Sequence, residues 1–429
     1  MKKIVKKLKT IKWQIKSEVA KYRYGNPASK LKIVGVTGTN GKTTTATLLY
    51  RTAIALGHKA GFIGTTNIMS NEKELKMDLR TSTTPDKMAL TKIFAEMVKD
   101  NCEYVFMEVS SHALDQKRVA GINFVGGIFT NLTQDHLDYH KSMENYFLTK
   151  KKFFQMLPAS AFALSNADEE HGLMMTEGIK AKKYFYGFDS PETRFRGNSP
   201  KPGFGERGLD FEATILNLDF NGLELLFNME HVKSNLLGKF NAYNLLAVWS
   251  ACKLLGFDIH EVAKILENIE PPTGRFQHFV SDSGVMGIVD YAHSPDSLEK
   301  VLKTINEIKE KNAKVICVFG CGGDRDPLKR RIMGKIGATL SDIPIFTSDN
   351  PRNEDPEKII AEMKTDLSMA EVAKIKSIAN RREAIQEAVK LAGKGDIILL
   401  AGKGHEDYQE IKGVKNHFDD MEELKKALC

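Results

Sequence analysis

From residue 31 to residue 44 the chain reads Leu-Lys-Ile-Val-Gly-Val-Thr-Gly-Thr-Asn-Gly-Lys-Thr-Thr. Its first part, residues 31–36, is apolar and predicts a buried strand. Its end opens a helical pattern over residues 43–56. The glycines in between allow the backbone to turn tightly, because glycine adopts conformations that other residues avoid. A strand, a glycine-rich turn and a helix in this order are typical of an α/β fold.

The turn also predicts phosphate binding. Its backbone can wrap an anion, the helix N-terminus points amide groups at it, and Lys42 adds a positive charge for the β- and γ-phosphates. Thr43 would place its hydroxyl on Mg²⁺. The spacing departs from the strict P-loop pattern, because Val36 stands where the first glycine belongs. The alternative is a turn that binds nothing. The residues expected to bind nucleotide here are Gly38, Thr39, Asn40, Gly41, Lys42, Thr43 and Thr44.

Apolar strands and helical patterns alternate along the rest of the chain, which favours a parallel sheet. Residues 194–208 predict an exposed loop between less regular β segments. A boundary is expected at 271–274, where a helical pattern over 259–269 ends. The predicted parts are a basic tail (1–28), a central P-loop domain with a parallel sheet (29–273) and a C-terminal Rossmann-like α/β domain (274–429). Further strands are expected at 104–107, 126–130, 287–289, 315–319, 344–347 and 397–400.

Composition is ordinary for a globular protein, with 42% hydrophobic and 27% charged residues in a chain of 429. No apolar stretch reaches the roughly 18 residues that span a bilayer, and no signal-peptide core is present. The five cysteines are scattered and form no CxxC pair, which indicates reduced thiols in a cytoplasmic enzyme. The net charge of +7 is concentrated in residues 1–23, which hold nine basic residues and one acid. The remaining chain is near neutral, so we expect no nucleic-acid partner.

The basic tail has an apolar stripe at helical spacing, formed by Ile4, Leu8, Ile11, Ile15 and Val19. Such a stripe among lysines is an interfacial-helix pattern, and it predicts peripheral contact of residues 1–23 with an anionic membrane. A disordered basic tail, or a helix packed on the core, is the alternative.

A carboxylate, Glu108, ends the predicted strand at 104–107. In folds of this kind a second carboxylate at such a strand end meets nucleotide-bound Mg²⁺. The alternative is an acid that is merely solvated. Glu108 opens the polar run Glu-Val-Ser-Ser-His, which favours a functional role.

Three motifs together resemble those of the Mur ligases, the muramyl-peptide ligases, and among them the E type. They read Gly-Thr-Asn-Gly-Lys-Thr-Thr from Gly38, Glu-Val-Ser-Ser-His-Ala-Leu-x-Gln-x-Arg-Val from Glu108, and Asn-Leu-x-x-Asp-His-Leu-Asp-Tyr-His from Asn131. The resemblance covers the chain from about residue 31 to its C-terminus, with the motifs in the family's order. It implies an ATP-dependent ligase of peptidoglycan synthesis, in which two domains close over ATP.

The resemblance implies roles in the central domain. His136 and Glu108 would be metal ligands, together with Thr43 and a carbamylated Lys150 that holds a second Mg²⁺; Lys42, Lys150 and His136 would serve catalysis. Lys151 and Lys152 are adjacent, so the choice of Lys150 is an inference from its spacing to Tyr146; an exposed helix face is the alternative. The residues that would bind the muramyl-peptide are Thr83, Thr84, Ser110, Gln116 and Arg118.

Four further residues would contact the nucleotide. By the same resemblance, Asn244 lies toward the adenine and Arg275 toward the phosphates, while Asp290 and His293, in Asp-Tyr-Ala-His-Ser-Pro, meet the ribose and base. Without the resemblance, Asn244 would be interpreted as a residue at the start of a helix, and Asp290 as a cap at the end of a strand.

Three loops that follow predicted strands would form the amino-acid pocket, because a parallel sheet presents its ligand loops at the carboxyl ends of its strands. By motif, Arg325, Asn350 and Arg352 would hold the acid groups, and Gly402 and Glu406 the distal ammonium, with Asp349 beside them. In E-type ligases an Arg at the fourth place of Asp-Asn-Pro-x goes with meso-diaminopimelate, whose distal carboxylate a guanidinium binds at two points. A surface ion-pair network is the alternative.

The implied reaction adds meso-diaminopimelate to UDP-MurNAc-L-Ala-D-Glu through an acyl phosphate, with ATP and two Mg²⁺ ions. Family members carry an N-terminal domain that holds the UDP, whereas about 30 residues precede the first strand here. The acceptor therefore stays open, and a lysine-adding or folylpolyglutamate-synthase-like ligase is an alternative. Two alternatives are not ligases. A non-ligating partner of an amidotransferase would carry a four-cysteine zinc insertion, which nothing in this sequence could form. A nucleotide-dependent switch agrees poorly with a complete second domain that carries an amino-acid pocket.

Overall fold

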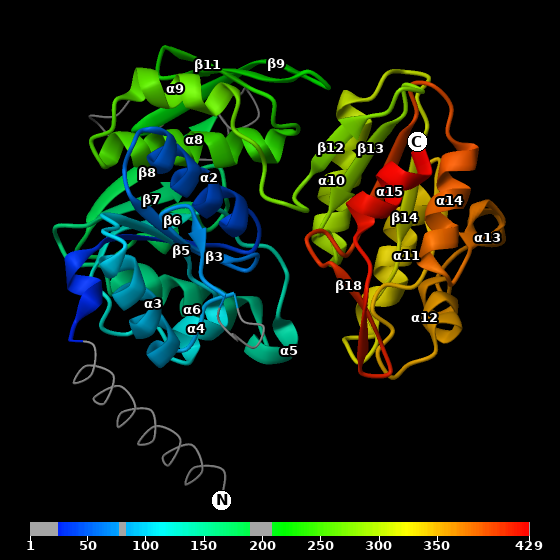
Figure 1. Ribbon diagram of the computed structural model, residues 1–429, viewed down its shortest axis with the longest axis horizontal. Helices are drawn as coiled ribbons and strands as arrows, with labels where there is room; N and C mark the ends of the chain where they lie inside the picture. Colours follow the sequence, from blue (N-terminus) through cyan, green and yellow to red (C-terminus); the bar gives the residue numbers. More distant parts are fainter. Residues whose placement is uncertain (1–24, 77–82, 189–207, 429) are drawn as a thin grey trace, which may run out of the picture. The chain divides into compact units, whose positions relative to one another are not determined.

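The computed structural model describes residues 25–76, 83–188 and 208–428, except for the side chain of Asp138. The predicted membrane-contact tail and nearly all of the predicted 194–208 loop lie outside these residues. The described chain forms two compact units, each with its own core (Figure 1). The N-terminal unit comprises residues up to 217 with 222–236 and 240–270, and the C-terminal unit comprises 271 onward with 218–221 and 237–239.

The described part of the N-terminal unit is built on an eleven-stranded sheet in which β1 (Lys32–Thr37) lies between β5 (Tyr104–Glu108) and β6 (Phe124–Phe129). The pairs from β2 through β5, β1, β6, β7 and β8 to β9 are parallel, whereas β2–β3, β3–β4 and β10–β11 are antiparallel. The remaining strands are β2 (Ala60–Ile63), β3 (Ile68–Ser70), β4 (Lys73–Glu74), β7 (Phe162–Asn166), β8 (Lys182–Phe188), β9 (Phe211–Asp219), β10 (Gly222–Phe227) and β11 (Glu230–Ser234).

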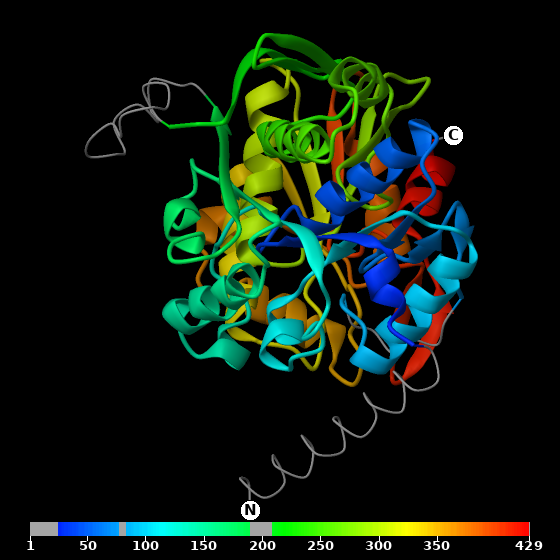
Figure 2. The same ribbon diagram turned by 90° about the vertical axis from the view of Figure 1, so that its left-hand side faces the viewer.

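Burial explains the central place of β1. Five of its six residues are buried, as expected for a parallel strand that has helices on both faces. Helix α2 packs on β1, β2 and β5, and α9 packs on β11 (Figure 2). The helices of this unit are η1 (Pro27–Lys30), α2 (Lys42–Ala55), α3 (Lys87–Lys99), α4 (Ser111–Asp115), α5 (Leu137–His140), α6 (Met143–Gln155), α7 (Gly172–Met175), α8 (Lys239–Leu254) and α9 (Ile259–Glu267).

The C-terminal unit has a six-stranded sheet in the order β12-β13-β17-β14-β15-β16, in which only the β12–β13 pair is antiparallel. Its strands and those of a separate hairpin are β12 (Gln277–Val280), β13 (Met286–Asp290), β14 (Val315–Phe319), β15 (Ile343–Phe346), β16 (Lys376–Ser377), β17 (Ile397–Ala401), β18 (Tyr408–Ile411) and β19 (Val414–His417). Its helices are α10 (Pro295–Ile308), α11 (Leu328–Leu340), α12 (Pro356–Met363), α13 (Met369–Lys374), α14 (Arg381–Leu391) and α15 (Asp420–Leu428).

These sheets confirm the predicted fold class, a parallel-rich α/β sheet followed by a second α/β domain. One expectation needs correction. The β segments around 194–208 are not irregular, because β8 to β11 extend the central sheet as regular strands. In both units the parallel order brings the loops after several strands to one edge. In the first unit these are the loops after β1, β5 and β6, and in the second those after β13, β17, β14 and β15.

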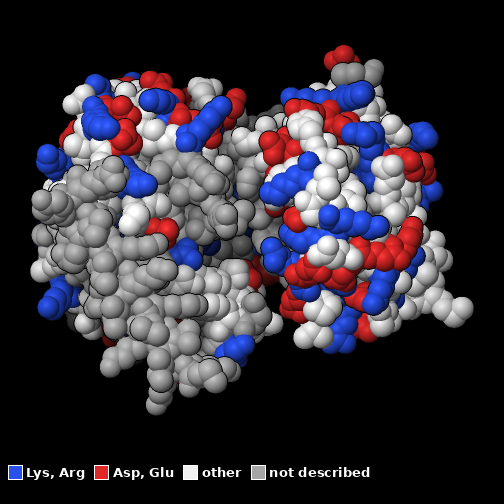
Figure 3. All heavy atoms as spheres, turned by 60° about the horizontal axis from the view of Figure 1, so that its bottom comes forward, with Lys and Arg blue, Asp and Glu red and all other residues white. Residues whose placement is uncertain are grey.

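On the visible face of the C-terminal unit, positive and negative side chains are mixed. Lys and Arg alternate with Asp and Glu on the face that Figure 3 turns to the viewer. Many of them are paired, as in Lys335–Glu371 (2.6 Å) and Arg382–Glu423 (2.6 Å). Among the described residues no helix has both the length and the apolar character needed to cross a membrane.

Candidate functional site

The loop between β1 and α2 fits tightly into the N-terminal unit. Gly38 has φ +154°, and a Cβ there would lie 1.9 Å from Thr130 Oγ1. Gly41 has φ +83° and caps the N-terminus of α2, and a Cβ there would lie 2.6 Å from Asn244 Oδ1. Only glycine therefore fits at either position. Thr43 and Thr44 follow, buried in the first turn of α2.

The segment after β6 holds this loop. Asn131 accepts a hydrogen bond from the Asn40 N–H (2.8 Å) and donates one to the Asn40 carbonyl (3.1 Å). Thr130 Oγ1 also donates to the Asn40 carbonyl (2.6 Å), and the Thr39 N–H donates to the Asn131 carbonyl (2.8 Å). The loop is therefore preorganised by the neighbouring strand end. Neither Thr130 nor Asn131 was among the predicted site residues, although Asn131 opens one of the motifs.

Two lysine side chains meet at the Gly38 carbonyl. Lys42 Nζ donates to it (2.9 Å) and to the Thr39 carbonyl (2.7 Å), and Lys150 Nζ donates to it at 2.7 Å. Lys150 is buried on α6, and its ammonium lies over the Tyr146 ring, 4.6 Å from the centroid. Burial, and secondarily the charge of Lys42, lowers the pKa of Lys150 well below that of an ordinary lysine. The neighbouring Lys151 instead pairs with Glu177.

Glu108 ends β5 inside the unit. Its two carboxylate oxygens accept hydrogen bonds from the Thr65 N–H (2.7 Å) and the Thr65 hydroxyl (3.2 Å), and the residue is almost fully buried. His136 lies at the start of α5 with φ +53°, and its ring is 4.9 Å from that of His112. Among the described residues, no three His, Cys, Asp or Glu side chains are grouped as a metal site. Any Mg²⁺ here would need oxygen atoms from other groups.

The predicted muramyl-peptide residues form one connected cluster, with the exception of Thr83. Thr84 Oγ1 donates to the Glu108 carbonyl (2.9 Å) and contacts Ser110 Oγ (3.2 Å). Arg118 donates to the Thr84 carbonyl (2.6 Å) and, through Nε and Nη2, to Gln116 Oε1 (2.9 and 2.6 Å). Ser110 follows β5 directly, Gln116 and Arg118 follow α4, and Thr84, from the segment before α3, contacts the end of β5. Thr83 is half-buried beside them, directly after the undescribed residues 77–82.

Asn244 reaches the phosphate loop from α8. Besides its closeness to Gly41, its Oδ1 accepts a hydrogen bond from Thr45 Oγ1 (3.3 Å), and its Nδ2 donates to Asn241 Oδ1 (3.0 Å). Asn244 is buried, and its side-chain amide supports the N-terminal turn of α2 through Thr45.

In the C-terminal unit, Arg275 and Asp290 lie around Tyr291. The Arg275 guanidinium stacks over the Tyr291 ring, 4.7 Å from the centroid, and the Phe276 N–H donates to Asp290 Oδ2 (2.7 Å). Burial raises the pKa of Asp290 to about 6, although Arg275 opposes this shift. His293 is exposed, 4.5 Å from the Tyr291 ring.

A histidine that sequence reasoning did not single out, His405, also lies beside this ring. Its centroid is 4.8 Å from that of Tyr291, and burial lowers the pKa of His405 to about 4. It belongs to the loop after β17, in Gly-Lys-Gly-His-Glu, which could have indicated a role.

The three predicted amino-acid loops do meet. Asn350 Nδ2 donates to Glu406 Oε2 (2.7 Å), and Asn350 Oδ1 accepts from the Glu410 N–H (2.8 Å). The buried Asp349 has an oxygen, Oδ1, that finds no hydrogen-bond partner among the described residues, and a Cβ at Gly402 would lie 3.8 Å from its Oδ2. Burial is the main reason that the pKa of Glu406 is raised, with Asp349 adding to it. Polar groups thus converge at this strand edge.

The two predicted arginines converge on Gly322. A Cβ at Gly322 would lie 2.9 Å from Arg352 Nη1 and 3.6 Å from Arg325 Cγ. Arg352 Nη1 donates to the Gly323 carbonyl (2.8 Å), and its Nε is 3.5 Å from Glu410 Oε2. Arg352 has φ +51°, so its backbone is held in the left-handed region. The Arg352 guanidinium thus lies beside Gly322, and the stem of the Arg325 side chain passes the same glycine.

Two residues that support the pocket were not predicted. Lys403 is fully buried; its Nζ donates to the Tyr408 carbonyl and is 3.7 Å from Glu406 Oε2. Arg330, on α11, is also buried and holds the loop that carries Arg325. A charged residue in a helix gives no sign of burial by itself, so only its position in the fold identifies it.

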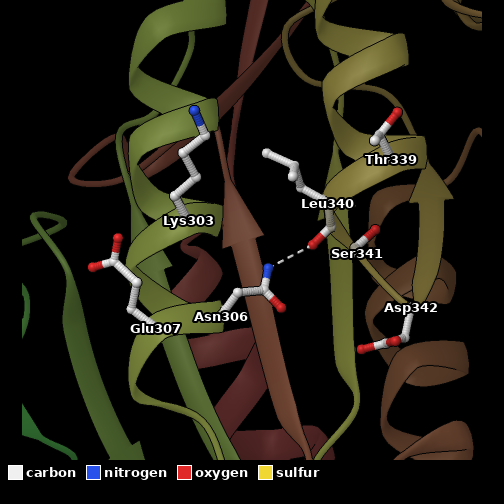
Figure 4. Close-up of a pocket in the computed structure, with 7 residues that line it drawn as sticks. All are labelled: Lys303, Asn306, Glu307, Thr339, Leu340, Ser341 and Asp342. Atoms are coloured by element: carbon white, nitrogen blue, oxygen red, sulfur yellow. Dashed lines mark hydrogen bonds between the residues drawn. The ribbon is translucent and has the colours of Figure 1, made fainter.

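Two cavities lie apart from all predicted residues. One, of about 380 Å³, is lined by α10 and by the end of α11, with Asn306 donating to the Leu340 carbonyl (2.8 Å; Figure 4). The other, of about 510 Å³, lies in the N-terminal unit between Arg51 and Glu270.

Each of the two units matches a known protein-family model. The model of the Mur ligase middle domain matches residues 36–252, and that of the Mur ligase glutamate ligase domain matches residues 274–404. These matches define the class of the protein as an ATP-dependent ligase that forms amide bonds. The chain belongs to the Mur ligase family.

Its relatives are diverse in source. It is 48% identical over 411 residues to the UDP-N-acetylmuramoyl-L-alanyl-D-glutamate–2,6-diaminopimelate ligase of Bacteroides thetaiotaomicron, covering 96% of this chain and 81% of that protein. With the enzyme of the same name from Geobacillus kaustophilus it shares 40% identity over 415 residues, covering 94% and 80%.

Solved structures agree in fold. A structure of a UDP-N-acetylmuramoyl-L-alanyl-D-glutamate–2,6-diaminopimelate ligase matches with a TM-score of 0.63 and 34% identity, over 93% of this chain and 78% of that one. Folylpolyglutamate synthase from Thermotoga maritima matches with a TM-score of 0.65 over 90% and 89%, but at 15% identity, so that likeness concerns the fold alone.

Proposed function

We propose that this enzyme adds meso-diaminopimelate to the D-glutamyl carboxylate of UDP-MurNAc-L-Ala-D-Glu. ATP phosphorylates that carboxylate, and the amine of the amino acid attacks the acyl phosphate, with release of ADP and phosphate. The names of relatives 47–49% identical to this chain support the proposal. We place the reaction in the cytoplasm, where the buried free thiols of Cys102, Cys252, Cys317 and Cys321 would remain reduced.

The observation that carries the proposal is the convergence of Arg325 and Arg352 at Gly322. A guanidinium binds a carboxylate at two points, and meso-diaminopimelate differs from lysine by one carboxylate on its distal carbon. Asn350 and Glu406 lie at the same strand edge, where a carboxylate oxygen can accept a hydrogen bond from the distal ammonium. The side chains therefore match both charges at the distal end of this amino acid.

For the phosphoryl transfer, we assign Lys42 and the amides at the α2 N-terminus to the ATP phosphates. Lys42 now donates to carbonyls of its own loop, and these bonds would exchange for bonds to phosphate oxygens. We assign Thr84, Ser110, Gln116 and Arg118 to the muramyl-peptide, because they form one cluster at the neighbouring strand end. For Asn244, Arg275, Asp290 and His293 we keep the predicted nucleotide contacts.

The donor atoms fit Mg²⁺, which prefers oxygen ligands. Thr43, Glu108 and a carbamylated Lys150 would supply oxygens, and His136 a nitrogen. Bound Mg²⁺ would offset negative charge on the transferring phosphoryl group. Carbamylation requires a neutral amine, and the buried position of Lys150 beside Lys42 favours that form. We therefore place the carbamate on Lys150 and not on Lys151 or Lys152.

The test is product formation. The enzyme is incubated with ATP, Mg²⁺, UDP-MurNAc-L-Ala-D-Glu and one amino acid from a panel of meso-diaminopimelate, L-lysine, L-ornithine and L-glutamate, and the product is identified by mass spectrometry. We expect a product with meso-diaminopimelate and stoichiometric phosphate release. Turnover with tetrahydrofolate and glutamate, and none with the muramyl substrate, would contradict the proposal.

A further inference from the structure

An ion pair outside the pocket holds two of the pocket's loops together. Arg330, on α11, is 2% exposed, and its guanidinium forms a fork with Glu354: Nη1 donates to Oε2 (2.9 Å) and Nη2 to Oε1 (2.8 Å). Nη2 also contacts the Gly322 carbonyl (3.3 Å). The pair therefore connects α11, the loop after β14 and the segment after Arg352. Arg330 is buried and Glu354 is partly exposed, and a two-point pair of this kind fixes geometry more strictly than a single hydrogen bond.

Glu354 acts on the loop directly. Its Oε1 accepts a hydrogen bond from the N–H of Asp324 (2.5 Å), the residue that precedes Arg325. Asp324 has φ +53°, a conformation that a non-glycine residue keeps only when its surroundings hold it. Asn353, which precedes Glu354 in the chain, donates a hydrogen bond from Nδ2 to Asp324 Oδ2 (2.7 Å). The backbone at Arg325 is thus fixed from the segment that follows Arg352.

The same two loops are joined on the pocket side. The Gly323 N–H donates to the Asn350 carbonyl (2.9 Å), and Arg352 Nη1 donates to the Gly323 carbonyl (2.8 Å). A Cβ at Gly323 would lie 1.9 Å from the Pro351 carbonyl oxygen, so the backbones are in close contact. The distance between the Arg325 and Arg352 side chains consequently depends on how these loops are held.

We propose that Arg330 and Glu354 are positioning residues for amino-acid selection: they set the spacing of Arg325 and Arg352, and so the fit to the distal carboxylate of the amino acid. The inference rests on the proposed function, because it takes the two arginines as the carboxylate site. Neither residue of the pair is among those assigned to the amino acid. Their effect acts through the loop backbone, where a displacement of about 1 Å can cost up to about a hundredfold in rate.

The molecule offers a matched control. Glu362, on α12, accepts a hydrogen bond from the same Arg330 Nη1 (2.7 Å). The bonds that join the pocket loops run through Glu354 and Asn353, and the Glu362 carboxylate bonds to Arg330. Glu354→Gln and Glu362→Gln each remove one carboxylate charge from Arg330, so both should lower the melting temperature by a few degrees. Only the first should change the pocket.

The experiment measures KM for meso-diaminopimelate, ATP and the nucleotide-peptide in the wild type and both variants. We expect Glu354→Gln to raise KM for meso-diaminopimelate about tenfold and to reduce its preference over L-lysine, with KM for ATP within about twofold. Glu362→Gln should leave all three KM values within about twofold. The proposal is overturned if Glu354→Gln leaves KM for the amino acid unchanged, or if both variants change all three KM values alike.

Asn353→Ala provides a second readout that does not depend on the buried pair, since its bond to Asp324 is at the surface. It should raise KM for the amino acid about threefold without lowering the melting temperature, and an unchanged KM would count against the inference. If the wild type ligates an amino acid other than meso-diaminopimelate, the proposed function fails by itself. In that case, KM of the same variants is measured with the amino acid that is ligated, and this result tests the positioning role separately.

Discussion

The ammonium of Lys150 lies 2.7 Å from the carbonyl oxygen of Gly38, 112 residues earlier in the chain. Lys42 donates to the same oxygen at 2.9 Å. Lys42 therefore places its positive charge in the loop where ATP phosphates would bind, next to the buried Lys150. Burial lowers the pKa of Lys150, and the nearby charge of Lys42 lowers it further.

The first prediction concerns this lysine. Lys150→Ala should abolish turnover, because it removes the side chain proposed to become a carbamate, and short-chain carboxylic acids should partly restore activity without bicarbonate. Lys151→Ala is the control, since Lys151 pairs with Glu177 at 3.8 Å and should be dispensable. Phosphate release over time measures both. Full activity of Lys150→Ala would exclude the metal-bridging role.

The second prediction separates backbone strain from steric fit in the phosphate loop. Gly41 and Gly57 have almost the same φ, +83° and +84°, but a Cβ at Gly41 would lie 2.6 Å from Asn244 Oδ1, whereas nothing lies within 4 Å of one at Gly57. Both alanine variants should lose about 1–2 kcal/mol of stability. Only Gly41→Ala should raise KM for ATP, by about tenfold or more, as measured by steady-state kinetics. Equal KM values for the two variants would show that the fit at Asn244 is irrelevant to ATP binding.

The third prediction concerns the amino acid. Arg352→Ala should weaken binding of meso-diaminopimelate by about 2–4 kcal/mol, the scale for unpairing a buried carboxylate. The KM for L-lysine, which has no distal carboxylate, should change much less. Arg331→Ala is a suitable control, because Arg331 is half exposed and pairs with Asp366 at 3.4 Å. A wild type that ligates L-lysine as well as meso-diaminopimelate would contradict the assignment.

The fourth prediction concerns pH. Burial raises the pKa of Asp290 from 3.8 to about 6, so the folded state binds its proton more tightly than the unfolded state does. This residue's contribution to the free energy of unfolding therefore falls as pH rises from about 4 to about 6, and up to about 3 kcal/mol is lost above that window. Asp290→Asn cannot titrate, so relative to the wild type it should gain stability between pH 4.5 and pH 7.5. Urea unfolding at both values measures this, and a difference that does not change with pH would refute the raised pKa.

The fifth prediction concerns the basic residues 1–23. Each basic residue near an anionic surface contributes about 1 kcal/mol, so a few of them suffice for measurable adhesion. The full chain should sediment with phosphatidylserine-containing vesicles at low salt and be released at high salt, whereas a chain that starts at Ser29 should stay in the supernatant. Equal sedimentation of the two chains would exclude anchoring by this segment.

The sequence alone predicted several central strands and the loops that follow them. The strand expected at 315–319 is β14, and the strand and turn from residue 31 are β1 and the phosphate loop, because apolar runs and glycines are local signals. The motif from Glu108 likewise marked the strand end where Thr84, Ser110 and Arg118 meet. These patterns are readable because each depends on neighbours in the chain.

The tertiary structure decided which distant residues share a site. The spacing to Tyr146 favoured Lys150 among three adjacent lysines, and the phase of α6 makes it the one that is buried against the phosphate loop. Asn131 holds Asn40 because β6 lies beside β1, and Arg330 binds Glu354 because α11 packs beside the segment that leads into α12. Such pairs depend on sheet order and helix packing. Whether a charged side chain is buried depends on the elements that pack around it, because the same residue on a solvated helix face would point into water.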